Sequence, residues 1–181
     1  MVNLVTFQNQ RYLVDVGFGR TSPCRPVPVG ASSETPGMGQ QRLRVYQKTL
    51  AQASDTSQKS WVYSHKGSDA EDWTDGYAFT EVEFFPDDFE VMNLRPMTSP
   101  SSFFVQSVVC VKVILGDADE PAGLLILLNK ELKRQVGGNT EVLATFRNEA
   151  ERIKGLEKWF AISLDEEQQK GITGLASELK E

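Results

Sequence analysis

The stretch YLVDVGFG, residues 12–19, places one carboxylate, Asp15, inside a run of apolar side chains. Apolar and β-branched residues of this kind are typical of a strand, and Gly17 and Gly19 let the backbone bend sharply where the strand ends. An ionised carboxylate in an apolar strand costs free energy unless it is paired. We therefore predict that Asp15 lies in a buried strand next to a bend.

Short strands separated by polar turns continue on both sides of this stretch. Residues 1–7 and 11–18 predict a hairpin, with Gln8, Asn9 and Gln10 as the turn. A Pro-rich segment (22–30) follows, then a loop over residues 30–39, and strands are expected over 42–50, over 61–65 and near 77–85. This alternation predicts a small antiparallel barrel or sandwich over residues 1–100.

The pattern changes after Pro100. Residues 102–115 and 123–129 predict two further strands, separated by the acidic turn GDADEPA. Apolar residues at helical spacing predict a helix over 148–160, with Asn148 as its N-cap. The fold class is therefore predicted to be α+β, with a β-barrel-like domain over 1–100 and a small α/β lid domain over 101–181.

Composition excludes several classes of protein. The chain of 181 residues has a net charge of −6 and a pI near 5.0, which argues against nucleic acid or an anionic membrane surface as a partner. Its longest apolar run, residues 122–128, is far below the roughly 20 residues of a membrane span. Polar residues interrupt any signal peptide, and two cysteines make no disulfide framework. We expect a cytoplasmic protein.

An ordered set of motifs resembles the arylamine N-acetyltransferases. The set consists of YLVDVGFG, the Pro-rich segment, the spacing of Trp73, Tyr77 and Phe79, and DDFEVMNLRPMTSPSSFF (87–104), in that order. The resemblance implies a β-barrel followed by an α/β lid, and a role in xenobiotic metabolism. It also implies transfer of an acetyl group from acetyl-CoA, through a cysteine, to an arylamine, hydroxylamine or hydrazine, with no metal. Such catalysis uses a thiolate, a histidine and an orienting carboxylate.

The resemblance assigns roles to particular residues. Asp15 is the orienting carboxylate. Phe18 lines the arylamine pocket, although it also suits the core at a barrel end, and Arg20 and Ser22 shape acceptor selectivity, although both also suit a solvated loop. Thr98, Ser101 and Ser102 lie near the entrance for CoA, although a Ser/Thr-rich turn between domains accounts for them equally well. Trp73, Tyr77 and Phe79 are expected to pack in the core.

Two members of the triad have no counterpart at the family's positions, because the family's cysteine and histidine precede the aspartate. Cys24 follows Asp15, Cys110 reads as a small core residue, and His65 reads as a solvated loop residue. A triad of Cys24, His65 and Asp15 has the wrong order for the family. The expectation is a truncated chain, inactive by itself. The alternative is a non-catalytic paralogue that binds CoA or an aromatic ligand, and an unrelated small β-barrel binding protein is the third hypothesis.

Overall fold

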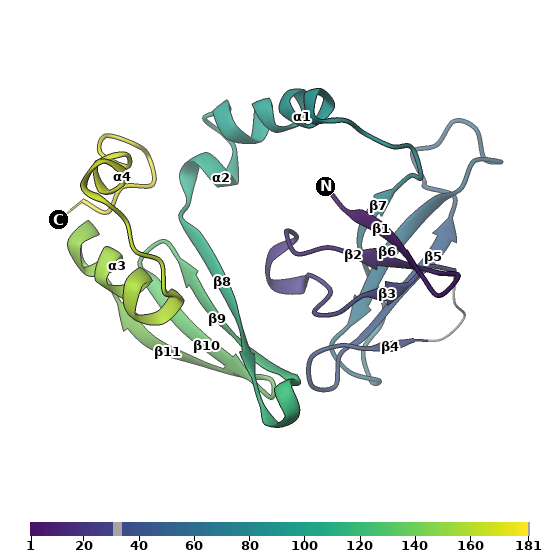
Figure 1. Cartoon of the computed structure of the whole chain (residues 1–181), viewed down its shortest axis with the longest axis horizontal. Helices are drawn as coiled ribbons and strands as arrows, with labels where there is room; N and C mark the ends of the chain where they lie inside the picture. Colours follow the sequence, from purple (N-terminus) through teal and green to yellow (C-terminus); the bar gives the residue numbers. More distant parts are fainter. Residues whose placement is uncertain (31–33, 181) are drawn as a thin grey trace. The chain divides into compact units, whose positions relative to one another are not determined.

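The computed structural model describes residues 1–30 and 34–180, which form two compact units (Figure 1). The first unit contains Met1–Glu83 together with Leu115–Ala122, and the second contains Phe84–Ile114 and the chain from Gly123 onward. Strands and helices lie in separate stretches of the chain, so the predicted α+β class is confirmed. The domain boundary expected at residue 100 stays a prediction.

The first unit holds two antiparallel sheets. One has the order β1-β2-β3, and its strands span Asn3–Phe7, Gln10–Val14 and Val27–Pro28. The other has the order β4-β5-β6-β7, with strands Thr35–Pro36, Arg42–Lys48, Ser60–Lys66 and Thr74–Phe79. A bridge between Val29 and Val45 links the sheets, and neither closes into a barrel among the described residues. The expected loop over 30–39 lies partly outside those residues, at 31–33.

The hairpin predicted at the start of the chain is confirmed, with Phe7 opposite Gln10. Gln8 and Asn9 both have positive φ angles, 47° and 63°, which suit a two-residue turn between twisted strands. Leu13 on β2 is fully buried against Val27, Leu43 and Tyr63 from three other strands. These apolar contacts hold the two sheets together, since burial of apolar surface is the main favourable contribution to folding.

The second unit is built on a four-stranded antiparallel sheet of order β11-β10-β9-β8. Its strands span Val109–Leu115 (β8), Pro121–Leu128 (β9), Glu131–Val136 (β10) and Asn139–Thr145 (β11). The helices are α1 (Pro86–Thr98), α2 (Phe103–Gln106), α3 (Glu149–Gly155) and α4 (Glu166–Lys170). Buried Leu127, Leu132 and Phe146 form the core, against which Trp159 and Leu179 pack.

The helix predicted over 148–160 is present in two parts. Asn148 caps α3 by accepting a hydrogen bond from the N–H of Glu151 at 3.0 Å, as expected. The chain then widens into one π-helical turn, η3 (Leu156–Phe160), which ends at Ala161 with a φ of 57°. A π-turn of this kind shifts the register of the helical face, so Trp159 and Phe160 reach the sheet.

The structure corrects three expectations about secondary structure. Helix α1 lies inside the first hundred residues, where short strands and polar turns were expected, because Pro86 and two acids suit a first helical turn. The strand expected over 102–115 begins only at Val109, after the short helix α2. The strand expected near 77–85 ends at Phe79. Strands β10 and β11 were not assigned, although Gly137-Gly138 between them is a hairpin signal.

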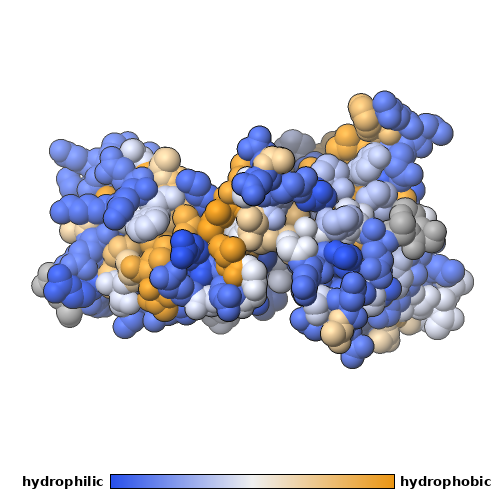
Figure 2. All heavy atoms as spheres, turned by 90° about the horizontal axis from the view of Figure 1, so that it is seen from below, coloured by the Kyte–Doolittle hydropathy of each residue, from blue (hydrophilic) through white to orange (hydrophobic). Residues whose placement is uncertain are grey.

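Apolar side chains also reach the surface. Helix α1 has no buried residue, and Val91, Met92, Leu94 and Met97 on it are all exposed. Figure 2 shows one face of the molecule, on which apolar areas interrupt a mainly hydrophilic surface. Within the part of the chain that is described, no helix combines the length and apolar character required to cross a membrane.

Candidate functional site

Asp15 is buried, with 6% of its surface exposed, and its carboxylate is held from two sides. The N–H of Gly17 donates a hydrogen bond to Oδ1 at 2.8 Å, and the Tyr77 hydroxyl donates to Oδ2 at 2.7 Å. Strand β2 ends at Val14, so Asp15 follows the strand instead of lying in it, which corrects the sequence prediction. The bond to Gly17 is an Asx turn, and such turns compete with the strand ladder.

A group of aromatic rings adjoins this carboxylate. The ring of Tyr77 lies 4.7 Å from that of Phe18, edge to face, and 5.2 Å from that of Tyr63. Burial, and then the hydrogen bond to Asp15, raises the pKa of Tyr77 above its usual range, so its hydroxyl stays a donor. Burial likewise raises the pKa of Tyr63, whose hydroxyl donates to the carbonyl oxygen of Thr21 at 2.9 Å.

Phe18 and Arg20 lie at the exposed edge of this group. Phe18 is 40% exposed, so one part of its ring packs on Tyr77 and another part faces solvent. Arg20 lies in the single turn η1 (Gly19–Thr21) and is exposed. An exposed aromatic edge can contact a flat ligand, and an exposed guanidinium two residues further along the chain can contact an anionic one.

His65 is not the solvated loop residue that the sequence suggested. It lies on β6, opposite Leu43 and Thr74, and is half-buried, with its ring 6.1 Å from that of Tyr63. Burial, and then the positive charge of Arg20, lowers its pKa below the usual value. His65 is therefore neutral at pH 7 and faces the side of the sheet that carries Tyr63.

The two cysteines occupy different surroundings. Cys24 lies in the Pro-rich segment and is partly buried. Cys110 lies on β8 and packs against the core of the second unit, and this burial raises the pKa of its thiol. A raised thiol pKa lowers the thiolate fraction at neutral pH, so Cys110 is a poor nucleophile.

The Ser/Thr-rich segment predicted near CoA joins α1 to α2. The hydroxyl of Thr98 donates to the Leu94 carbonyl and that of Ser102 to the Pro96 carbonyl, both at 2.6 Å. Ser101 is exposed, and its hydroxyl lies 3.1 Å from that of Ser99. The hydroxyls of Thr98 and Ser102 therefore donate their protons to nearby backbone carbonyls, while their oxygens can still accept hydrogen bonds.

Tyr77 is the residue of this site whose role the sequence reasoning missed. It was expected to pack in the core, and its ring does pack there, together with Phe79. Its hydroxyl, however, reaches Asp15. A buried tyrosine hydroxyl usually finds a hydrogen-bond partner. Because Asp15 was expected to be buried and to need a partner, this rule could have indicated the contact between the two residues. Trp73 instead stacks under Arg44, whose guanidinium carbon lies 4.0 Å from the ring centre. The described residues include no group of three or more potential metal ligands.

Comparison with known proteins identifies the family to which this chain belongs. A family profile described as N-acetyltransferase matches residues 1–169, and the chain therefore belongs to the N-acetyltransferase family. Among curated relatives, N-malonyltransferase FDB2 of Gibberella moniliformis is 33% identical over 180 residues, covering 95% of this chain and 52% of its own length. The chain thus spans about half the length of the curated relatives that it matches.

Solved structures of the same family share the fold. The arylamine N-acetyltransferase of Salmonella typhimurium superimposes with a TM-score of 0.72 at 19% identity, over 91% of this chain and 54% of that one. The arylamine N-acetyltransferase of Mycobacterium marinum, solved in complex with CoA, gives a TM-score of 0.69 at 24% identity, over 89% of this chain and 53% of that one.

Proposed function

We propose that this chain provides the orienting carboxylate and the donor-binding segment of an acyl-CoA-dependent N-acyltransferase. The observation that carries the proposal is Asp15. It is buried at the end of a strand, held by Gly17 and Tyr77, and beside a half-exposed aromatic ring. A carboxylate has about four lone-pair directions and two are used, which leaves room for an imidazole N–H.

The proposed reaction has two covalent steps. A cysteine thiolate attacks the thioester carbonyl of the acyl-CoA, and the CoA thiolate leaves and takes up a proton. An aromatic amine, hydroxylamine or hydrazine nitrogen then attacks the acyl-cysteine, and the cysteine sulfur leaves as the nitrogen loses its proton. A histidine holds the thiol proton, and Asp15 fixes the tautomer of that histidine and stabilises its imidazolium form.

Substrate contacts are assigned by position. Phe18 is proposed to stack on the aromatic ring of the acceptor and Arg20 to contact its substituents. Thr98, Ser101 and Ser102 are proposed to accept or donate hydrogen bonds to CoA. Acetyl-CoA is the donor implied by the family, and the identity with N-malonyltransferases favours testing malonyl-CoA beside it.

A second candidate function is binding without turnover, and it rests on the chain's own cysteines and histidine. Cys110 is a poor nucleophile, and the hydrogen bonds of Asp15 go to Gly17 and Tyr77. Under this candidate the chain binds a CoA thioester or an aromatic ligand but transfers no acyl group. Binding of an imidazole at Asp15 separates the two candidates, because only the first requires this carboxylate to orient a histidine.

The role of Asp15 has a direct test that needs no turnover. Free imidazole, added as a probe of the proposed contact, should bind weakly, with a Kd of about 1–100 mM, and shift the amide signal of Gly17 in NMR spectra. Asp15→Asn keeps the size of the side chain but removes its charge, and should abolish this shift. If the unmodified chain and Asp15→Asn respond equally to imidazole, Asp15 is not a histidine-orienting carboxylate.

A further inference from the structure

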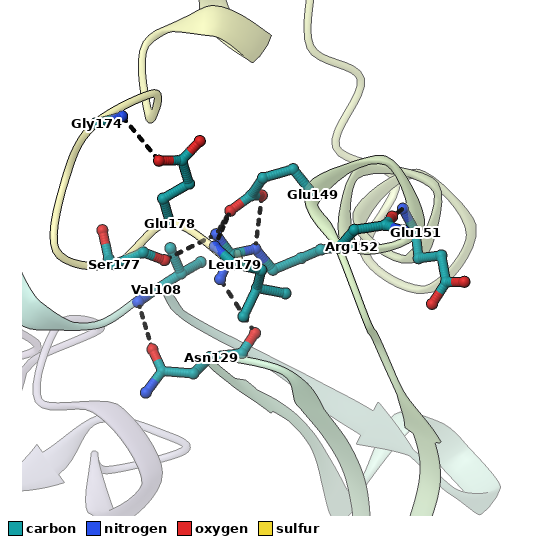
Figure 3. A network of polar contacts seen from close by, with 10 residues as sticks. Val108, Asn129, Glu149, Glu151, Arg152, Gly174, Ser177, Glu178 and Leu179 are labelled. Carbon is teal, nitrogen blue, oxygen red and sulfur yellow. Dashed lines mark hydrogen bonds and ion pairs between the residues drawn. The ribbon is translucent and has the colours of Figure 1, made fainter. Parts of the chain in front are cut away.

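Arg152 on helix α3 is buried, with 1% of its surface exposed, and it connects this helix to two other parts of the second unit (Figure 3). Its guanidinium donates to both carboxylate oxygens of Glu149, one turn earlier on α3. It also donates to the carbonyl of Asn129 at 3.3 Å and to that of Ser177 at 3.0 Å. A buried charge is tolerated only when it is paired and hydrogen-bonded, and Arg152 meets both conditions.

The first part is the C-terminal segment, residues 174–179. Its backbone contacts the ion pair twice, since Arg152 reaches Ser177 and the N–H of Leu179 donates to Glu149 at 2.7 Å. The Leu179 side chain packs on the core of the sheet. Within the segment, the Gly174 N–H donates to the Glu178 carboxylate at 2.9 Å, as Figure 3 shows. The ion pair is therefore the polar anchor of this segment on α3.

The second part is the start of β8. Asn129, at the turn between β9 and β10, has a left-handed φ of 54°. Its side-chain oxygen accepts from the N–H of Val108 at 3.1 Å, and its own N–H donates to the Val108 carbonyl at 2.8 Å. Val108 lies between α2 and β8. Asn129 thus accepts a hydrogen bond from Arg152 with its backbone carbonyl, and binds Val108 with its side chain and its N–H.

We infer that Arg152 is a positioning residue, which ties the attachment of the C-terminal segment to the placement of residues 98–108. This inference rests on the proposed function in one respect, namely that residues 98–102 contact CoA. The physical basis is that polar contacts at Arg152, Glu149 and Asn129 form one continuous set. When the Arg152–Glu149 pair is lost, the carbonyls of Asn129 and Ser177 both lose their donor inside the protein, so both segments loosen together.

The decisive experiment is amide hydrogen exchange on the full chain. The double variant Glu149→Leu/Arg152→Leu removes both charges, and replacing a buried ion pair by apolar residues usually preserves folding. We expect the amide of Leu179 to exchange about 10- to 100-fold faster in this variant, and that of Val108 about 10-fold faster. Faster exchange at Leu179 with unchanged exchange at Val108 would overturn the coupling.

Two further variants make the test specific. Arg147→Gln breaks the exposed pair between Arg147, which precedes α3, and Glu151 on α3. It should change neither amide, and so controls for the loss of another ion pair that involves this helix. Asn129→Gly keeps the left-handed backbone but removes the side-chain contact to Val108, so it should loosen Val108 without releasing Leu179. Release of both amides by Arg147→Gln would show that α3 simply frays.

Calorimetry with CoA links the coupling to function. We expect the double variant to bind CoA about 5- to 10-fold more weakly, while Arg147→Gln stays within about twofold of the unmodified chain. If the unmodified chain binds no CoA, the donor-binding proposal fails, and the exchange data still decide the coupling. Undiminished CoA binding by the double variant would overturn the positioning role while leaving the donor-binding proposal intact.

Discussion

The hydroxyl of Tyr77 donates a hydrogen bond to Oδ2 of Asp15 at 2.7 Å, and so joins residues that are 62 positions apart in the sequence. The contact links β7 of one sheet to the end of β2 in the other. It occupies one oxygen of the carboxylate, while the Gly17 N–H occupies the other. The side chain of Asp15 is therefore fixed before any further partner binds, which is what an orienting group requires.

Removing this hydroxyl should destabilise the chain. Tyr77→Phe leaves one buried carboxylate oxygen without its donor, and we expect the free energy of unfolding to fall by about 1–3 kcal/mol. Urea denaturation measures this change. Tyr12→Phe, on strand β2, is the matched control and should cost less than about 0.5 kcal/mol. Equal stabilities of the two variants would mean that the Tyr77 contact does not stabilise the fold.

The same contact predicts a dependence of stability on alkaline pH. The pKa of Tyr77 is raised in the folded state, whereas an unfolded tyrosine ionises near a pKa of about 10. The stability that Tyr77 contributes is therefore complete below about pH 10 and is lost as the pH rises above that value. Melting temperatures of the unmodified chain and of Tyr77→Phe should converge between about pH 10 and 12. Parallel curves would contradict the raised pKa.

His65 predicts an effect at acidic pH. Burial and the charge of Arg20 lower its pKa in the folded state, so the unfolded chain takes up the proton first. The stability that neutral His65 contributes is present above its unfolded pKa of about 6.5 and is lost as the pH falls toward the folded value. His65 is the chain's single histidine, so NMR can follow its ring signals without overlap.

Two variants test the charges that act on His65. Arg20→Gln removes a positive charge and should raise the pKa of His65, whereas Glu71→Gln removes a negative charge and should lower it further. Opposite shifts are expected because the first charge disfavours the imidazolium and the second favours it. If neither variant moves the titration of His65, burial alone accounts for its pKa.

A side chain at Gly76 should be destabilising, because a Cβ added there would lie 3.0 Å from Cδ1 of Tyr63 and 3.2 Å from Cε1 of Phe18. Gly76→Ala forces these rings apart and should cost about 1–3 kcal/mol of unfolding free energy. Because Phe18 moves, binding of an aromatic amine should weaken as well. Ala78→Ser, at an exposed position of the same strand, is the control. Unchanged stability of Gly76→Ala would show that the rings can shift freely.

Local patterns predicted several elements well, and the reason is that neighbouring residues decide them. The hairpin of β1 and β2 follows from alternating apolar residues around a short polar turn. Strands β5 and β6 lie where strands were expected over 42–50 and 61–65, and the cap at Asn148 follows from its side-chain oxygen. Helix α1 was missed because its apolar residues lack a buried face, although Pro86 marked its first turn.

The sequence by itself determined the family, the α+β class and Asp15 as the acid of interest, because each depends on the identity and order of nearby residues. Only the tertiary structure decided what Asp15, His65 and Arg152 contact. Tyr77 reaches Asp15, and Ser177 reaches Arg152, because separate strands and helices bring distant residues within hydrogen-bond distance. Such contacts depend on how the apolar faces of distant strands and helices pack together, and a local sequence pattern does not determine that packing.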